Sequence, residues 1–311
     1  MTENFLHQPV MLSQVMTGLN VCAEGCYVDA TFGRGGHSRA ILNGLGAEGR
    51  LLVLDRDAQA IAAAQVLAQE DQRLIPVHCS FAGLESAVRE QGWFERVDGV
   101  LLDLGVSSPQ LDDPQRGFSF LRNGPLDMRM DTHSGLDAAS WLATAEEYDI
   151  THVLKVFGEE RFARRIARKL VEVRAETPIT TTHQLAELIA TAVPFKEKHK
   201  HPATRSFQAI RIFINQELEE LKQVLPQVVN CLAPAGRMAV LSFHSLEDRI
   251  VKRFIRDEQR GPQLPPDLPI IPDEYRPRLR AVGKMSKATN EEVQQNPRAR
   301  SAVLRIAERG A

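Results

Sequence analysis

Residues 26–37 read Cys-Tyr-Val-Asp-Ala-Thr-Phe-Gly-Arg-Gly-Gly-His, and residues 50–57 read Arg-Leu-Leu-Val-Leu-Asp-Arg-Asp. The first stretch predicts a strand and a glycine-rich turn that opens a helix, and the second predicts a strand that ends in Asp55. Such a turn brings backbone N–H groups close to a nucleotide-like ligand, and the acid can reach ribose hydroxyls. Glycine suits the turn because it tolerates positive φ and lets the backbone approach a ligand closely. These two stretches predict a nucleotide-binding α/β unit.

The turn departs from the dinucleotide fingerprint G-x-G-x-x-G, because position 38, where the third glycine would fall, is Ser38. An acid, Asp29, also precedes the turn. This pattern favours a nucleoside with a positively charged amino-acid tail over a pyrophosphate. The alternative is a glycine turn in an ordinary α/β domain.

Four strand-like runs with helical patterns between them fill the first 110 residues. They lie at 27–30, 50–55, 74–79 and 97–104. Right-handed crossovers between such runs predict a parallel, Rossmann-like sheet. A fifth strand is expected at 237–242, and a last strand at 301–307 could close the sheet as an antiparallel edge.

Turn formers and then helical periodicity follow the fourth strand. We therefore expect an all-helical domain inserted at residues 113–205. Residues 1–112 and 206–311 would be the two parts of one α/β domain, the second part beginning with a single long helix over 206–232.

Charge is distributed unevenly along the chain, although the net charge is only −2. Residues 1–150 carry 10 Arg, no Lys and 21 acids, a balance of −11, whereas residues 249–311 carry 14 basic and 8 acidic residues, a balance of +6. An acidic part suits a cationic ligand, and a basic surface suits polyphosphate. Charge that simply varies between domains is the alternative.

The chain shows no pattern of a secreted or membrane protein. Its four cysteines form neither a C-x-x-C pair nor a disulfide framework, which favours a reduced, cytoplasmic location. The first ten residues do not resemble a signal peptide, and no apolar run approaches the ~18 residues that a membrane helix needs.

The loops after the first four strands should meet at one crevice, because ligands of open α/β sheets bind at the carboxyl ends of the strands. These loops contribute the glycine turn, Asp55, Phe81 and the segment Asp103–Gln110. Four such loops together are more specific than any one of them. Phe81 alone could equally be a packing residue.

Several longer strings are distinctive. They are Gly33-Arg-Gly-Gly-His37, Leu102-Asp-Leu-Gly-Val-Ser-Ser-Pro-Gln-Leu-Asp112, Arg116-Gly-Phe-Ser-Phe120, Gly124-Pro-Leu-Asp-Met-Arg-Met130, Gly158-Glu-Glu-Arg-Phe162, His201-Pro-Ala-Thr-Arg205, Ser242-Phe-His-Ser-Leu-Glu-Asp-Arg249 and Asn296-Pro-Arg-Ala-Arg-Ser301. With them, residues 5–309 resemble the bacterial small-subunit ribosomal RNA methyltransferase H family, also called RsmH or MraW.

The resemblance implies a class I methyltransferase sheet and N4-methylation of a cytidine in 16S rRNA with S-adenosylmethionine as cofactor. The implied target is cytidine 1402, in conventional rRNA numbering, at the decoding centre of the small ribosomal subunit. The sequence itself leaves the oligomeric state open, with a homodimer as one alternative. By motif position, the resemblance assigns cofactor contacts to Gly35, Gly36, His37, Asp55, Phe81, Asp103 and Gln110.

A reaction at an exocyclic amine needs acceptors for its N–H groups and in-line positioning of the methyl group, but no metal. The candidate catalytic residues are Ser107, Ser108, Pro109 through its carbonyl, and His244. The two serines could instead only cap a turn, and His244 could position the base, accept a proton or serve loop structure. The Asp/Asn/Ser-Pro-Pro-aromatic tetrad of other amino-methyltransferases is absent, so the acceptor stays open.

Basic residues near the return of the insertion and before the last strand are candidates for RNA contacts. They are Lys196, Lys198, Lys200, Arg205, Arg298 and Arg300. His199 and His201 lack partner ligands, so we expect no metal site there. Two other classes of protein compete with this interpretation, namely a nicotinamide-dependent oxidoreductase and a non-catalytic RNA-binding factor.

Overall fold

The computed structural model describes residues 9–194, 201–261 and 277–310. The chain divides into two compact units, residues 1–105 with 218–311 and residues 106–217. We describe each unit by itself.

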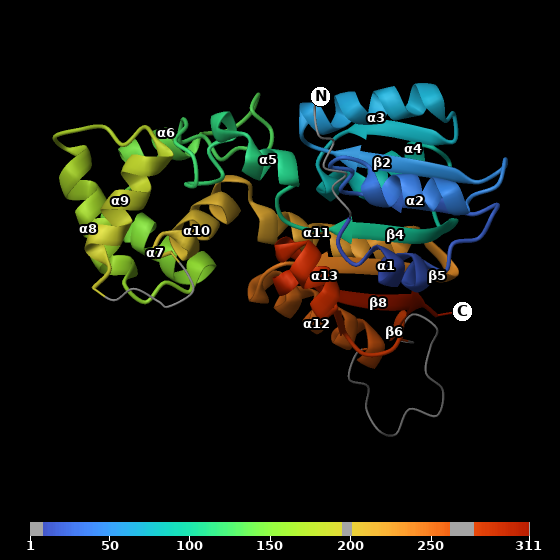
Figure 1. The fold of residues 1–311 in the computed structure, drawn as a ribbon. Coiled ribbons are helices and arrows are strands. Elements are labelled where there is room, and N and C mark those ends of the chain that lie inside the picture. The colour runs from blue at the N-terminus through green and yellow to red at the C-terminus, as the bar shows by residue number, and fades with distance from the viewer. Residues whose placement is uncertain (1–8, 195–200, 262–276, 311) are drawn as a thin grey trace, which may run out of the picture. The chain divides into compact units, whose positions relative to one another are not determined.

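The described part of the first unit contains an eight-stranded sheet with the order β3-β2-β1-β4-β5-β8-β6, and β7 also pairs with β8 (Figure 1). The strands are β1 (Cys26–Asp29), β2 (Arg50–Asp55), β3 (Leu74–His78), β4 (Val97–Asp103), β5 (Leu232–Ser242), β6 (Leu279–Ala281), β7 (Ser286–Lys287) and β8 (Val303–Arg309). The first five are parallel, and β8 is antiparallel to β5. Strand order reverses between β1 and β4, which makes this the switch point where ligands bind in such sheets. The predicted Rossmann-like class is confirmed.

Helices cover both faces of this sheet, which explains why the strands are almost continuously apolar. The helices of the unit are α1 (Leu12–Leu19), α2 (Gly36–Gly44), α3 (Ala58–Glu70), α4 (Leu84–Glu90), α11 (Glu217–Cys231), α12 (Ser245–Arg260) and α13 (Asn290–Gln295), with the short turns η1 (Phe81–Gly83) and η4 (Pro297–Ser301). Alternate residues of one strand enter different cores: Leu52 packs with α4, α11 and α12, whereas Leu51 and Val53 pack with α1 and α2.

The last strand lies where the sequence places it, but it is not the edge of the sheet. β8 pairs with β5 on one side and with β6 and β7 on the other. The two short strands escape prediction because runs of three and two residues are too brief to show a strand period.

Helices make up the regular structure of the second unit in its described residues, apart from an isolated bridge between Pro125 and Thr181, and an irregular loop spans residues 117–137. Its helices are α5 (Ser108–Asp112), η2 (Pro114–Arg116), α6 (Ala138–Thr144), α7 (Glu147–Gly158), α8 (Ala163–Arg174), α9 (Thr182–Ala192) and α10 (Thr204–Ile214). They enclose a core of their own, which includes Trp141, Ile166 and Phe207. The unit divides from the sheet domain at 105/106 and 217/218, rather than at 112/113 and 205/206, because Val106, Leu111 and Ile210 pack in this core.

The prediction of a single helix over residues 206–232 is wrong. The chain forms α10 and α11, with a break at Asn215 and Gln216, and Gln216 takes a left-handed φ of 52°. The Asn215 side chain accepts a hydrogen bond from Met130 N at 2.7 Å and donates to Met128 O at 2.7 Å. A buried amide that binds a loop far away in the sequence explains why the helix ends here.

Candidate cofactor-binding site

The glycine turn between β1 and α2 is anchored on both neighbouring strands. Ala30 N donates to Leu101 O of β4, and Phe32 N donates to Leu54 O of β2, each at 3.0 Å. Gly33 and Gly35 have φ of 57° and 73°. A Cβ on Gly35 would lie 2.7 Å from the Phe32 ring, and one on Gly36 would lie 2.9 Å from Pro9. The backbone therefore needs glycine for its conformation at Gly33, for space at Gly36, and for both at Gly35.

Asp29 stabilises the glycine turn through hydrogen bonds to residues on both sides of it. Its side chain is 1% exposed, and its carboxylate accepts from Ser38 Oγ at 2.6 Å and from Thr31 N at 3.1 Å. Burial raises the pKa of Asp29, although the Ser38 hydroxyl opposes this shift. Ser38 thus replaces the third fingerprint glycine with a hydrogen-bond donor. Both residues are conspicuous in the sequence, but their pairing appears only in the folded chain.

Asp55 lies against the glycine turn at the end of β2. Its Oδ2 accepts from Gly33 N and its Oδ1 from Asp57 N, both at 2.8 Å. Burial raises the pKa of Asp55 to about 6, although the two backbone N–H groups oppose the shift. An ionised carboxylate offers about four acceptor positions, so two hydrogen bonds leave room for ligand hydroxyls.

Asp103 ends β4 on the other side of the turn. Its N–H donates to Thr31 Oγ1 at 2.7 Å, and its Oδ2 lies 3.4 Å from His37 Nδ1. Its Oδ1 is buried without a hydrogen-bond partner among the described residues. A buried carboxylate oxygen without a donor is costly, and a ligand N–H or O–H would satisfy it.

His37 is buried behind Asp103, with 5% exposure, and its Nε2 lies 3.0 Å from Val10 O. Burial alone lowers the pKa of His37, but the hydrogen bond and charge of Asp103 outweigh it and raise the pKa above its ordinary value. A protonated imidazole donates from both nitrogens, to Val10 O and to Asp103. His37 therefore orients Asp103, whatever further contact it makes.

Phe81 begins η1 after β3 and packs partly buried against the core. The ends of β1 to β4 share one edge of the sheet, because all these strands are parallel and in register. Gly35, Gly36, His37, Asp55 and Asp103 are thus brought together, and Phe81 follows the neighbouring strand at the same edge. The glycine cradle and the acceptors of Asp55 and Asp103 fit a nucleoside cofactor.

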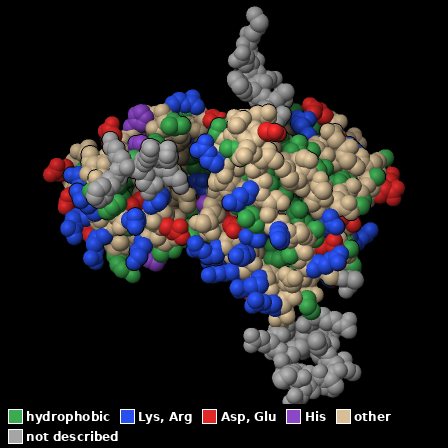
Figure 2. All heavy atoms as spheres, turned by 60° about the horizontal axis from the view of Figure 1, so that its bottom comes forward, with side chains coloured by type: hydrophobic (Ala, Val, Ile, Leu, Met, Phe, Trp, Pro, Cys, Tyr) green, Lys and Arg blue, Asp and Glu red, His purple; other side chains and the backbone are tan. Residues whose placement is uncertain are grey.

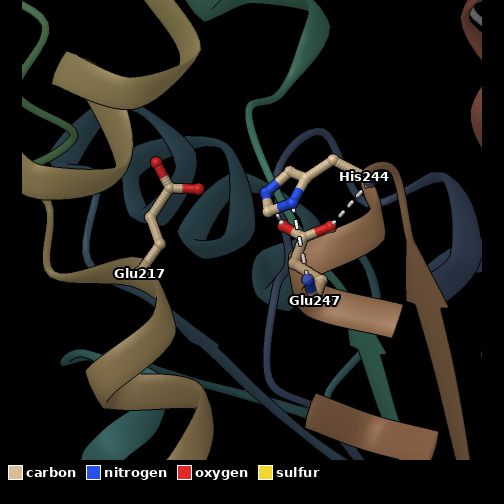
Figure 3. A group of neighbouring side chains, drawn as sticks. All are labelled: Glu217, His244 and Glu247. Atoms are coloured by element: carbon tan, nitrogen blue, oxygen red, sulfur yellow. Dashed lines mark hydrogen bonds and ion pairs between the residues drawn. The ribbon is translucent and has the colours of Figure 1, made fainter. Parts of the chain in front are cut away.

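His244 leaves the same edge, because β5 pairs in parallel with β4 through Asp103 and Leu241. It caps α12, and Figure 3 shows its ring beside Glu247. Glu247 N donates to His244 Nδ1 at 3.4 Å, and the N–H groups of Phe243 and His244 donate to Glu247 Oε2 at 2.7 and 3.3 Å. His244 Nε2 lies 3.1 Å from Glu247 Oε1. Glu247 was not among the residues predicted from the sequence, although the spacing of a capping box, His244-x-x-Glu247, could have indicated it.

Ser107, Ser108, Pro109 and Gln110 belong to the second unit. Ser107 is the N-cap of α5, and its N–H donates to Gln110 Oε1 at 2.9 Å. Pro109 stands in the first turn of this helix. Ser107 and Gln110 therefore have a capping role in the structure, which was the alternative for Ser107.

The candidate RNA contacts belong to different parts of the chain. Lys196, Lys198 and Lys200 lie outside the described residues. Arg205 is half-buried in α10, Arg298 and Arg300 lie in η4, and Arg300 is exposed. The His201 ring packs against the Phe120 ring at a tilt of 33°, with centroids 4.6 Å apart, and its Nδ1 accepts from Ala203 N, so it has a structural role.

The strand order, the switch point and the glycine turn beside it define a Rossmann-like α/β protein. Residues 4–310 match the sequence model of the MraW methylase family, so the chain belongs to that family. The resemblance found from the motifs is confirmed, and the protein is a methylase by family. No helix among the described residues is both long and apolar enough to cross a membrane.

Solved structures similar in fold include a proposed rRNA methylase from Clostridium thermocellum, at 12% identity and a TM-score of 0.47, with 97% of this chain and 98% of that chain covered. Another is an rRNA methylase from Streptococcus thermophilus, at 12% identity and a TM-score of 0.44, with 100% and 99% covered. A third is a proposed methyltransferase from Streptococcus mutans in complex with SAH, at 9% identity and a TM-score of 0.43, with 97% and 98% covered.

Proposed function

We propose that this protein is an S-adenosylmethionine-dependent methyltransferase that modifies N4 of a cytidine in 16S rRNA, at cytidine 1402 of the decoding centre. The observation that carries the proposal is the match of nearly the whole chain to the MraW methylase family. The glycine turn and its acids supply a site of suitable chemistry. The cytidine and its position come from the family resemblance.

The cofactor, when bound, supplies a methyl group on a positively charged sulfur. In this proposal the turn at Gly33–Gly36 approaches the cofactor with its backbone, and Asp55 accepts hydrogen bonds from the ribose hydroxyls. Phe81 stacks on the adenine. Asp103, which His37 orients, accepts a hydrogen bond from an N–H or O–H group of the cofactor through its Oδ1. The carboxylates Asp29, Asp55 and Asp103 suit a cationic ligand.

The target amine needs acceptors for its hydrogens on the side away from the methyl donor. Ser107, Ser108, the Pro109 carbonyl and His244 are the candidates. For His244, the structure favours positioning of the base over proton acceptance at Nδ1, because His244 Nδ1 already accepts a hydrogen bond from the backbone N–H of Glu247 at 3.4 Å. A cytosine in a helix must leave its stack to expose N4, at a cost of a few kcal/mol.

Substrate RNA would meet basic residues of both units, namely Lys196, Lys198, Lys200, Arg205, Arg298 and Arg300. Replacing any residue that binds a phosphate should reduce the salt dependence of RNA binding, because fewer counterions are then released. In this proposal the helical unit recognises RNA and contributes little to cofactor affinity.

Methyl transfer from labelled S-adenosylmethionine to small subunits or 16S rRNA from cells lacking this protein tests the function. We expect label in RNA, and N4-methylcytidine at the target nucleotide by mass spectrometry. Label at another atom would overturn the N4 assignment, and label absent from every RNA would overturn RNA methylation. Thermal shift with S-adenosylmethionine and NAD side by side tests the oxidoreductase alternative, which predicts stabilisation by NAD.

A further inference from the structure

The first unit has a basic pocket that the cofactor site does not use. It lies between α12 and the turn that joins β6 to β7, over β8, and its volume is about 160 Å³. Figure 2 shows Lys and Arg side chains gathered over this region. The residues that build it are Lys252, Ile255, Arg256 and Gln259 of α12, Ala281 of β6, residues 282–285 of the β6–β7 turn, and Arg305 and Ile306 of β8.

Local structure explains how cations come to line the pocket. Lys252, Arg256 and Gln259 follow one another at helical spacings of four and three residues, so they lie on one face of α12. On the opposite wall, the chain bulges between β6 and β7, which pair in the same direction along β8, and Gly283 has a φ of 70° within this bulge, next to Lys284 and Met285 of the pocket lining. Met285 is 45% exposed, and Ile255 is buried below.

The charge of the pocket is one-sided. Four of its lining residues are cations, and no carboxylate lines it among the residues that the structure describes. Lys252 and Lys284 are exposed and make no hydrogen bond or ion pair with the described residues. Arg256 pairs with Asp257 and Arg305 pairs with Asp248, but neither acid lines the pocket. Lys252 and Lys284 are therefore the cations that no described acid neutralises, and they favour an anionic partner.

Arg305 is oriented in advance. Its Nε lies 2.7 Å from Asp248 Oδ1 and its Nη2 lies 3.1 Å from Asp248 Oδ2, which holds the guanidinium plane from one side. The remaining nitrogen, Nη1, has no such bond to Asp248. A fixed guanidinium edge suits the oxygens of a phosphate.

The size and the position of the pocket indicate what kind of anion it takes. Small-molecule sites usually measure ~300–1,000 Å³, so this pocket fits a phosphate and its sugar rather than a second cofactor. Lys252, Arg256 and Gln259 stand on α12 seven, eleven and fourteen residues after Ser245, or ~10–21 Å along the helix at ~1.5 Å per residue. RNA that reaches the His244 end of α12 with its target nucleotide can therefore place a phosphate close to that nucleotide here.

We propose that this pocket binds a backbone phosphate of the substrate RNA close to the target nucleotide. The apolar floor distinguishes it from a bare charged surface, because a nucleotide offers a sugar as well as a phosphate. The inference rests on the proposed function in taking RNA as the substrate.

The test compares two double variants of the full-length protein. Lys252→Gln with Lys284→Gln removes two cations from the pocket. Arg253→Gln with Lys287→Gln removes one cation from the same helix and one from β7, directly after the segment that lines the pocket, but neither residue lines the pocket itself. RNA affinity is measured by fluorescence anisotropy with a 16S rRNA fragment between 50 and 200 mM salt. Cofactor affinity, by calorimetry, shows that each variant is folded.

For the pocket variant, we expect weaker RNA binding. The plot of log association constant against log salt concentration should also become less steep, by ~0.7 for each phosphate of single-stranded RNA that is no longer bound. The control variant should bind RNA as the wild type does, and both should keep cofactor affinity. Equally weakened binding by the two variants would mean diffuse attraction, and an unchanged pocket variant would mean that RNA does not touch the pocket. Either result overturns the inference while the methylation assay still stands.

If the wild-type protein neither binds nor methylates RNA, the proposed function itself fails and the RNA assignment of the pocket falls with it. A polyglutamate peptide is the probe for the competing partner, an acidic protein segment. Binding of this peptide that the pocket variant loses and the control retains, with RNA binding unaffected, would also overturn the assignment to RNA.

Discussion

At the scale of single residues, the candidate cofactor site depends on buried carboxylates whose ionisation is opposed by their surroundings. Asp29 and Asp55 both have raised pKa values because they are buried, and backbone or hydroxyl donors only partly offset this. A bound cation and ligand hydroxyls would favour their charged forms. Occupancy of the site and ionisation of these acids should therefore be linked.

We predict that cofactor affinity falls as the pH is lowered through about 6, the pKa of Asp55. The ionised carboxylate accepts from ribose hydroxyls, whereas the protonated form, which dominates below this pKa, has lost part of its acceptor capacity. If only the ionised form binds, the dissociation constant should rise roughly tenfold per pH unit below the pKa. Isothermal calorimetry with S-adenosylmethionine between pH 5 and 7.5 measures this.

Asp55→Ala is the control for this prediction. It should weaken cofactor binding about 10–100-fold at pH 7.5, the effect of losing a charged hydrogen-bond acceptor worth ~1.5–3 kcal/mol. It should also flatten the pH profile. A variant with wild-type affinity would show that Asp55 does not bind the cofactor. A variant whose affinity shows the same decline at low pH would show that a group other than Asp55 controls the pH dependence of binding.

At the scale of elements, the glycine turn combines strained backbone conformation with close packing, and the two can be separated by substitution. Gly35 and Gly92 have nearly the same φ, 73° and 72°. A Cβ at Gly35 would meet the Phe32 ring at 2.7 Å, whereas one at Gly92 would meet nothing within 4 Å. Gly92 is therefore a matched control for backbone strain without close packing.

We predict that Gly35→Ala lowers both thermal stability and cofactor affinity, whereas Gly92→Ala lowers stability only. The left-handed conformation costs an alanine about 1 kcal/mol at either position. At Gly35 the Phe32 ring must also move, and the turn that approaches the cofactor moves with it. Thermal unfolding and calorimetry on both variants measure the two effects. Equal decreases in stability, with cofactor affinity intact in both, would contradict a role of close packing at Gly35.

At the scale of the whole molecule, the chemistry proposed here needs no cysteine nucleophile, and the structure offers no activated one among the cysteines with shifted pKa values. Burial raises the pKa of Cys231 to about 12 and that of Cys79 to about 11, and it also raises the pKa of Cys26. A reactive thiol has a lowered pKa instead. Methylation at cytosine C5, unlike methylation at N4, would require a cysteine thiolate that adds to C6 of the ring.

We therefore predict that a variant with Cys22, Cys26 and Cys79 changed to Ser and Cys231 to Ala keeps methyl transfer to RNA, provided that it folds. Circular dichroism and cofactor affinity establish folding, and labelled methyl transfer measures turnover. The single variants serve if the quadruple variant does not fold. A covalent cysteine adduct with 5-fluorocytosine RNA, or 5-methylcytidine as product, would contradict N4-methylation.

Much of the sheet domain could be predicted from the sequence because its signals are local. The glycine turn, the strands around it and the acid Asp55 lie within about 30 residues, and strand period, turn chemistry and crossover handedness together leave few topologies. The structure adds the hydrogen bond from Gly33 to Asp55 that joins the two halves of this stretch. The family, too, was evident from strings of adjacent residues.

What the sequence could not determine depends on residues that meet only after the chain has folded. Asn215 ends a helix because its amide binds the backbone of Met128 and Met130, more than 80 positions away. The β6–β7 turn takes its place because β8 offers it an unpaired edge, and the basic pocket exists because this turn faces α12. Periodicity reports which side of an element is buried, but not what lies against it. Neighbours of this kind are decided by packing in three dimensions.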